Sequence, residues 1–124
     1  MAHKVLVVDD SIVMARQLTK LLLDAGYEVV GHANNGVEAL KLYAALSPDV
    51  VLMDIVMPTM DGIEALRALV KQDPKARVVV ISSLGGVGSK VETAFRLGAC
   101  GIVTKPFESA QVCAALARAL AGQG

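Results

Sequence analysis

Four short runs of apolar residues recur along the chain without alternating with polar residues. They occupy residues 5–8, 50–53, 78–81 and, in a shorter form, 102–103. A strand buried on one face alternates apolar and polar side chains, whereas a strand buried on both faces is apolar throughout. A fifth segment, residues 27–33, is more mixed and suits the edge of a sheet. The runs therefore predict a sheet that is covered on both sides.

Amphipathic helical patterns separate these strands. The first places Ala15, Leu18 and Leu22 on one stripe, as expected for a helix that buries one face. The second begins with a capping box, in which Asn35 precedes Glu38 by three residues. The five predicted helical segments are residues 12–25, 35–46, 63–70, 90–97 and 108–121.

Strands and helices therefore alternate five times along the chain. Parallel strands joined through helices need right-handed crossovers. The predicted fold class is α/β, an open, doubly wound, five-stranded parallel sheet with five helices and the flavodoxin-like strand order 2-1-3-4-5. At 124 residues, the chain is long enough for one such domain, residues 1–124, and too short for a second module.

The overall charge and hydropathy exclude two classes of partner. Twelve Lys and Arg residues balance twelve Asp and Glu residues, so no global field attracts nucleic acid or an anionic membrane. No apolar run approaches the roughly 18 residues that a membrane span needs. We therefore expect a cytoplasmic protein that binds neither nucleic acid nor membrane directly. Cys100 and Cys113 lie among apolar neighbours and are expected to be small buried hydrophobes.

Three aspartates follow strands that are neighbours in this strand order. Asp9 and Asp10 come directly after the first strand, and Asp54 ends the third. Sheets of this kind bind ligands beyond the carboxyl ends of the strands where the strand order reverses, here between strands 1 and 3. Each aspartate alone could simply cap a helix. Three carboxylates in one crevice repel one another, and a hard divalent cation relieves the repulsion. The sequence therefore predicts a Mg²⁺ site, which Mn²⁺ could also occupy.

Two further strand ends add groups that can bind an anion. Ser82 ends the fourth strand, and Lys105 ends the fifth, just before Pro106. The lysine alone could form a structural salt bridge. Carboxylates, a metal ion, a hydroxyl and an ammonium group together indicate a site for a tetrahedral phosphoryl group.

The chain resembles the receiver domain of two-component response regulators over nearly its whole length. Four fragments carry the resemblance in order: VLVVDDS at residues 5–11, VVLMDIVMPTMDG at 50–62, ISS at 81–83 and GACGIVTKPF at 98–107. The resemblance implies that Asp54 is the nucleophile that becomes an acyl phosphate. Such a chain is a phosphoacceptor that assists its own phosphorylation and turns over no separate substrate.

The same resemblance implies a role for each residue around Asp54. Asp10 would ligate the metal directly, Asp9 mainly through water, and the main-chain carbonyl of Val56 would be a further ligand. Ser82 would hydrogen-bond one phosphoryl oxygen, and Lys105 would pair with another. A cis bond between Lys105 and the following proline would aim the lysine inward.

The resemblance also implies a donor and a switched surface. The donor would be a phosphohistidine on a sensor histidine kinase or a phosphotransfer protein. Movement of Ser82 and Lys105 would reshape the face made by the fourth helix, fifth strand and fifth helix, which binds an unidentified downstream protein. The family usually has Tyr or Phe three residues before the lysine, where this chain has Ile102, so the aromatic reporter of the switch is missing. A monomer and a phosphorylation-dependent dimer are both compatible with this switch.

Two further positions and the length of one loop depart from the simplest pattern. Val56 and Leu84 are apolar and cannot orient an attacking water, which predicts a comparatively long-lived phospho-form. The loop after the fourth strand is one residue longer than in single-domain chemotaxis regulators. Counting back from Lys105 selects Ser83 as the phosphate-binding hydroxyl, but the strand end selects Ser82, which we prefer because it points into the crevice.

Other functions remain to be weighed against a stand-alone regulator. The glycine-rich residues 85–88 are similar to the receiver of chemotaxis methylesterases, so the chain could be a regulatory module of a larger enzyme. A flavodoxin-like electron carrier is disfavoured by the acidic first loop and the absence of Trp. An aspartate phosphohydrolase would need an acid–base Asp where Val56 stands. His3 and His32 neighbour no ligand set and are expected to pack or face solvent.

Overall fold

The computed structural model describes residues 2–55, 62–83, 88–105 and 108–121. Strands and helices alternate along the whole of this part of the chain, as the sequence predicts. The elements are β1 (Lys4–Val8), α1 (Ile12–Asp24), β2 (Glu28–Ala33), α2 (Gly36–Leu46), β3 (Val50–Asp54), α3 (Gly62–Gln72), β4 (Val78–Ser83), α4 (Gly88–Leu97), β5 (Gly101–Lys105) and α5 (Ser109–Ala121).

The five strands form one parallel sheet in the order β2-β1-β3-β4-β5. This confirms the predicted fold class and strand order. The strand order reverses beside β1, because β2 lies on one side of it and β3 on the other. In the register of the sheet, Val8 lies opposite Met53, and Asp54 lies opposite Ile81. The ends of β1, β3 and β4 therefore meet at one edge of the sheet.

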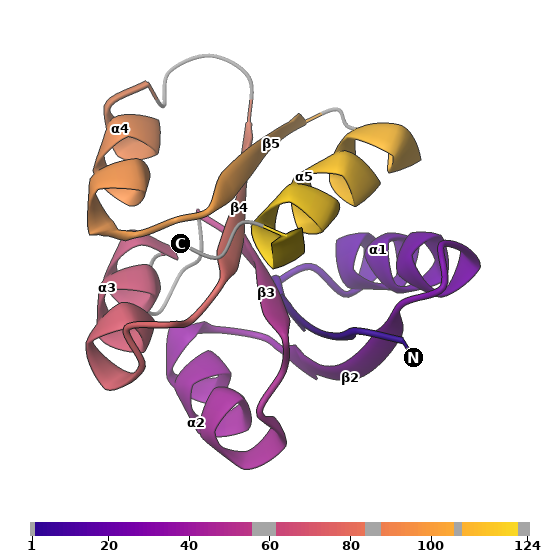
Figure 1. Ribbon diagram of the computed structural model, residues 1–124, viewed down its shortest axis with the longest axis horizontal. Helices are drawn as coiled ribbons and strands as arrows, with labels where there is room; N and C mark the ends of the chain where they lie inside the picture. Colours follow the sequence, from indigo (N-terminus) through magenta and orange to yellow (C-terminus); the bar gives the residue numbers. More distant parts are fainter. Residues whose placement is uncertain (1, 56–61, 84–87, 106–107, 122–124) are drawn as a thin grey trace.

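Helices cover both faces of the sheet, with α2, α3 and α4 on one side and α1 and α5 on the other (Figure 1). One apolar layer joins alternate strand residues such as Leu6 and Val80 to α2, α3 and α4, and the other joins Val7 and Leu52 to α1 and α5. All of these strand side chains are fully buried. The continuous apolar runs are explained by this arrangement, since both faces of each inner strand need apolar residues.

Helix caps fix the chain where it leaves the carboxyl edge of the sheet. Ser11 precedes α1, and its Oγ accepts a hydrogen bond from the Met14 N–H at 3.2 Å. The predicted cap at α2 is confirmed, because Asn35 Oδ1 accepts from the Glu38 N–H. In return, Glu38 Oε1 accepts from the N–H of Asn34, one residue before the N-cap position of a standard capping box. Both caps hold the loops that follow β1 and β2.

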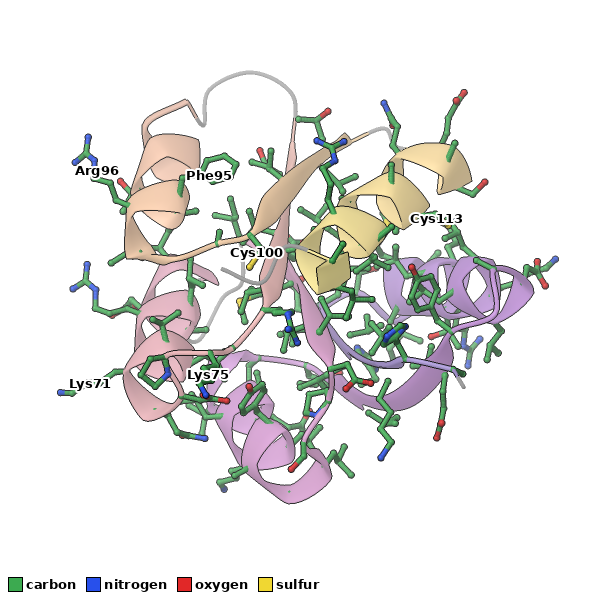
Figure 2. The ribbon with its side chains drawn as sticks, in the orientation of Figure 1. Lys71, Lys75, Phe95, Arg96, Cys100 and Cys113 are labelled. Atoms are coloured by element: carbon green, nitrogen blue, oxygen red, sulfur yellow. The ribbon has the colours of Figure 1, made fainter. Side chains whose placement is uncertain are left out.

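The prediction that both cysteines are buried is wrong. Cys100 is exposed in the turn just before β5, and Cys113 is half-buried on α5, on the side facing α1 (Figure 2). Their apolar sequence neighbours are misleading, because Cys100 lies in the turn between α4 and β5 rather than inside an element. No helix among the described residues has the length and hydropathy required to cross a membrane.

Candidate functional site

The loop that follows β1 is held by hydrogen bonds to the main-chain N–H, the main-chain carbonyl and the side chain of Asp9. The Asp9 N–H donates to the carbonyl of Ala33 at 3.0 Å, and Asp9 Oδ1 accepts from the Ser11 N–H at 2.9 Å. The main-chain carbonyl of Asp9 accepts from Nε2 of His32 at 2.8 Å. The residue is 1% exposed, so its carboxylate is buried in a fixed position at the sheet edge.

Asp54 brings a second buried carboxylate to the same place. It is the last residue of β3 and is 5% exposed, and the next residue, Ile55, donates its N–H to the carbonyl of Ile81 at 3.0 Å. Side chains alternate along a strand. Asp9 and Asp54 continue the alternation that places Val7 and Leu52 on the face covered by α1 and α5. The two carboxylates therefore leave the sheet on one side.

Asp10 completes a cluster of three carboxylates. One ligand oxygen from each of Asp9, Asp10 and Asp54 lies within 4.8 Å of the other two. Asp10 is exposed, whereas the other two are buried, so the cluster opens toward solvent on one side. The sequence prediction that these aspartates converge at the carboxyl edge is met by this geometry.

The cluster suits a hard divalent cation. Burial disfavours the charged form of a carboxylate, and a neighbouring carboxylate adds to that cost. Asp9 Oδ2 is buried and accepts no hydrogen bond from the described residues, although Oδ1 of the same side chain does. Magnesium prefers oxygen ligands and keeps several waters, which the exposed side at Asp10 would admit.

Ser82 lies beside this cluster in the register of the sheet. It is 1% exposed on β4, one residue beyond Ile81, the residue opposite Asp54. On the other side of β4, Ser82 pairs with Thr104, and Ser83 pairs with Lys105. The side chains of Ser83 and Lys105 lie outside the described residues, as do Val56, Leu84 and Pro106. The roles expected of those groups, including the cis bond before Pro106, therefore remain predictions.

The sequence predicts that His32 packs or faces solvent, and the structure adds a hydrogen bond between its half-buried ring and the site. It lies on β2 opposite Val7, and its ring reaches the carbonyl of Asp9. A signal for this contact exists in the strand pattern. His32 is paired with Val7, so its side chain projects to the face of the sheet that α1 covers. This places a polar ring beside the loop that follows β1.

A family model and curated relatives match the chain. The model of the response regulator receiver domain matches residues 5–117. The chemotaxis protein CheY of Thermotoga maritima is 43% identical over 116 residues, which are 94% of this chain and 96% of its own length. The protein-glutamate methylesterase/protein-glutamine glutaminase of Halalkalibacterium halodurans is 45% identical over 104 residues, 83% of this chain but only 30% of that protein.

Solved structures agree with this assignment. In the CheX–CheY–BeF3–Mg complex from Borrelia burgdorferi, the matched chain has a TM-score of 0.87 and 35% identity, with 92% of this chain and 86% of that chain covered. The family resemblance read from the four sequence fragments is thereby confirmed, and so is the flavodoxin-like architecture. From its matched residues, its sheet order and its relatives, the chain belongs to the response regulator receiver domain family.

Proposed function

We propose that this receiver domain takes a phosphoryl group onto Asp54 from a phosphohistidine of a sensor histidine kinase or phosphotransfer protein in the cytoplasm. The single observation that supports this most is the cluster of Asp9, Asp10 and Asp54 at the reversal point of the sheet. Phosphoryl transfer asks a protein mainly for positioning and for neutralisation of charge. A buried carboxylate beside two others and an adjacent buried hydroxyl provides a nucleophile and its surroundings in fixed positions.

In the proposed reaction, one carboxylate oxygen of Asp54 forms a bond to phosphorus. The bond from phosphorus to the donor's imidazole nitrogen breaks, and the nitrogen leaves with the electron pair. Asp9, Asp10, Asp54 and the carbonyl of Val56 would hold Mg²⁺, which would offset the negative charge of the phosphoryl oxygens. Ser82 would donate its hydroxyl to one phosphoryl oxygen, and Lys105 would pair with another.

The relative from Borrelia supports this proposal, because it was crystallised together with BeF3 and magnesium. The test for this chain is treatment with acetyl phosphate, a small phosphodonor, followed by intact-mass measurement. We expect the mass of one phosphoryl group to be gained with magnesium, and no gain when EDTA removes the metal before the donor is added. Absence of any gain with either Mg²⁺ or Mn²⁺ would refute the proposal.

We further propose that this receiver domain acts in a chemotaxis-type regulator. The chain spans nearly the full length of the Thermotoga chemotaxis protein. The alternative is a receiver module of a methylesterase, which the Halalkalibacterium relative supports over less than a third of its length. The complete reading frame distinguishes the two, since an esterase domain after residue 124 would favour the second.

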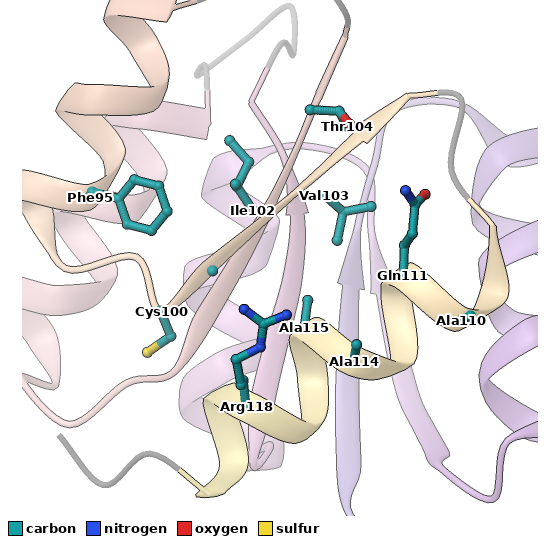
Figure 3. Close-up of a pocket in the computed structure, with 11 residues that line it drawn as sticks. Phe95, Cys100, Ile102, Val103, Thr104, Ala110, Gln111, Ala114, Ala115 and Arg118 are labelled. Carbon is teal, nitrogen blue, oxygen red and sulfur yellow. The ribbon is translucent and has the colours of Figure 1, made fainter.

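A groove marks the face that we propose as the output surface. It lies between α4, β5 and α5, and its volume is about 610 Å³ (Figure 3). Phe95, 47% exposed, and Ile102 line it on the α4 side, and Arg118 reaches over it from α5. Ile102 on β5 is paired with Val80 on β4, and Ser82 lies two residues after Val80 on the same strand. Because side chains alternate along a strand, Ser82 and Ile102 project to the same face of the sheet. A shift of Ser82 would therefore be felt by Ile102.

Cys100 offers a direct test of this coupling without any partner protein. The thiol is exposed and lines the groove, so a fluorinated label on it would report the groove in ¹⁹F NMR. In a Cys113→Ser background, we expect the label's resonance to shift when beryllofluoride and magnesium are added. The same addition to Asp54→Asn should leave the resonance in place. A signal that does not move in the wild-type site would show that Ile102 transmits nothing to this face.

The apolar residue at position 56 predicts slow loss of the phosphoryl group. An aliphatic side chain cannot orient the water that attacks phosphorus, whereas an amide can. We expect Val56→Asn to accelerate hydrolysis of the phospho-form roughly tenfold, less than the ~10²–10⁴-fold of general acid–base catalysis, because an amide orients the water without taking its proton. The measurement is the decay of the phosphorylated mass after removal of the donor. An unchanged decay rate would contradict this explanation, and Val56→Leu is the matched control.

A further inference from the structure

His32 contacts the main chain of Asp9 and has no direct role in the proposed phosphoryl transfer. Its ring is half-buried on β2, and Nε2 lies 2.8 Å from the main-chain oxygen of Asp9. A carbonyl oxygen can only accept a hydrogen bond. The contact therefore requires that Nε2 carries the hydrogen and donates it.

This hydrogen bond acts on the peptide that joins two of the three clustered aspartates. Backbone pairing between β1 and β2 ends with Val8 opposite Ala33, followed by one further bond from the Asp9 N–H to Ala33. The carbonyl of Asp9 lies beyond that pairing, and His32 replaces the missing partner. Asp10 is exposed, so its position depends on the orientation of this peptide more than on packing.

We propose that His32 is a positioning residue for the carboxylate site. This proposal rests on the proposed function. Through its hydrogen bond to the main chain of Asp9, His32 orients the Asp9–Asp10 peptide, so that both carboxylates face Asp54 before a cation binds. Groups that orient metal ligands from outside typically change metal affinity by roughly 10–100-fold when removed. A backbone anchor of this kind lowers the cost of ordering the loop when the cation binds.

The test compares two substitutions in the protein without any phosphodonor. His32→Leu removes the donor, whereas His32→Gln can place an amide N–H near the position of Nε2. Titration with Mg²⁺, followed through backbone amide resonances, should give about tenfold weaker binding for the Leu variant. The Gln variant should recover most of the wild-type affinity. His3→Leu, which lies at the opposite end of β1, is the control and should bind as the wild type does.

Two readouts need no metal and separate this proposal from the proposed function. Long-range ¹H–¹⁵N spectra of the wild type should show His32 with its hydrogen on Nε2. The ¹⁵N order parameter of the Asp10 amide should fall in His32→Leu and recover in His32→Gln. Hydrogen on Nδ1 alone, an unchanged order parameter in the Leu variant, or failure of the Gln variant to restore it would overturn the proposal. If the wild type binds no cation while these two readouts hold, the proposed function fails and the positioning role stands.

Discussion

The Asp54→Asn variant is expected to gain no phosphoryl mass under conditions in which the wild type gains one group. The physical reason is the loss of the nucleophile, because an amide oxygen carries no full charge and forms no stable acyl phosphate. Asp54 is buried at the end of β3, and Asn has nearly the same shape, so the fold should persist. Intact-mass measurement after treatment with acetyl phosphate and magnesium gives the result directly.

A matched control is available on α1. Asp24 is exposed at the end of that helix and away from the sheet edge, so Asp24→Asn should be phosphorylated as the wild type is. Peptide mapping of the wild-type product should locate the group on Asp54. Equal mass gain by the Asp54 variant, or phosphorylation mapped to another residue, would refute the assignment of the acceptor.

The Asp10→Asn variant is expected to be more stable than the wild type in EDTA and to respond less to magnesium. Its carboxylate lies with those of Asp9 and Asp54 within 4.8 Å, and like charges at this separation destabilise the folded state. Because Asp10 is exposed, the substitution buries no new polar group and leaves no cavity. Removing one charge should therefore raise the free energy of unfolding when no cation is present.

Magnesium should reverse this order. A ligand at 100 times its Kd stabilises the folded state by about 2.7 kcal/mol, and a tenfold loss of affinity would roughly halve that gain at the same concentration. Urea unfolding of both proteins, with EDTA and with magnesium, measures all four free energies. Equal stabilisation of the two proteins by magnesium would show that Asp10 does not bind the cation. Glu108→Gln, an exposed charge before α5, should change neither comparison.

The fold was predictable because its strongest signal lies in the buried strands. The apolar runs at residues 5–8 and 50–53 fall within β1 and β3. They could be recognised because a strand covered on both faces has apolar side chains throughout. The fifth strand was predicted too short. Backbone pairing with β4 extends β5 from Gly101 to Lys105. The main chain at both ends of the strand pairs with β4 whatever the side chain, so these residues carry no apolar signal in the sequence. Helix α4 begins at Gly88 rather than Lys90, because the backbone of Gly88 and the next residue enters the helix without an amphipathic signal.

The candidate site divides in the same way. The convergence of Asp9, Asp10 and Asp54 was predictable, because strand order alone brings the ends of β1 and β3 together. The bond from His32 to the Asp9 carbonyl was not, because it depends on the reach of one ring across the sheet edge. Motifs identify the groups that perform chemistry more readily than the groups that hold a backbone in place.

The parallel pairing of β1 with β3 determines when, during folding, the proposed phosphorylation site forms. Parallel strands need a long crossover, and here β2 and two helices must form between β1 and β3. Asp54 meets Asp9 and Asp10 only after that pairing, so a chain in which β1 and β3 have not paired lacks the carboxylate cluster. Phosphorylation of Asp54 would therefore be restricted to molecules in which the first half of the sheet has formed, and copies unfolded in that half would not be phosphorylated.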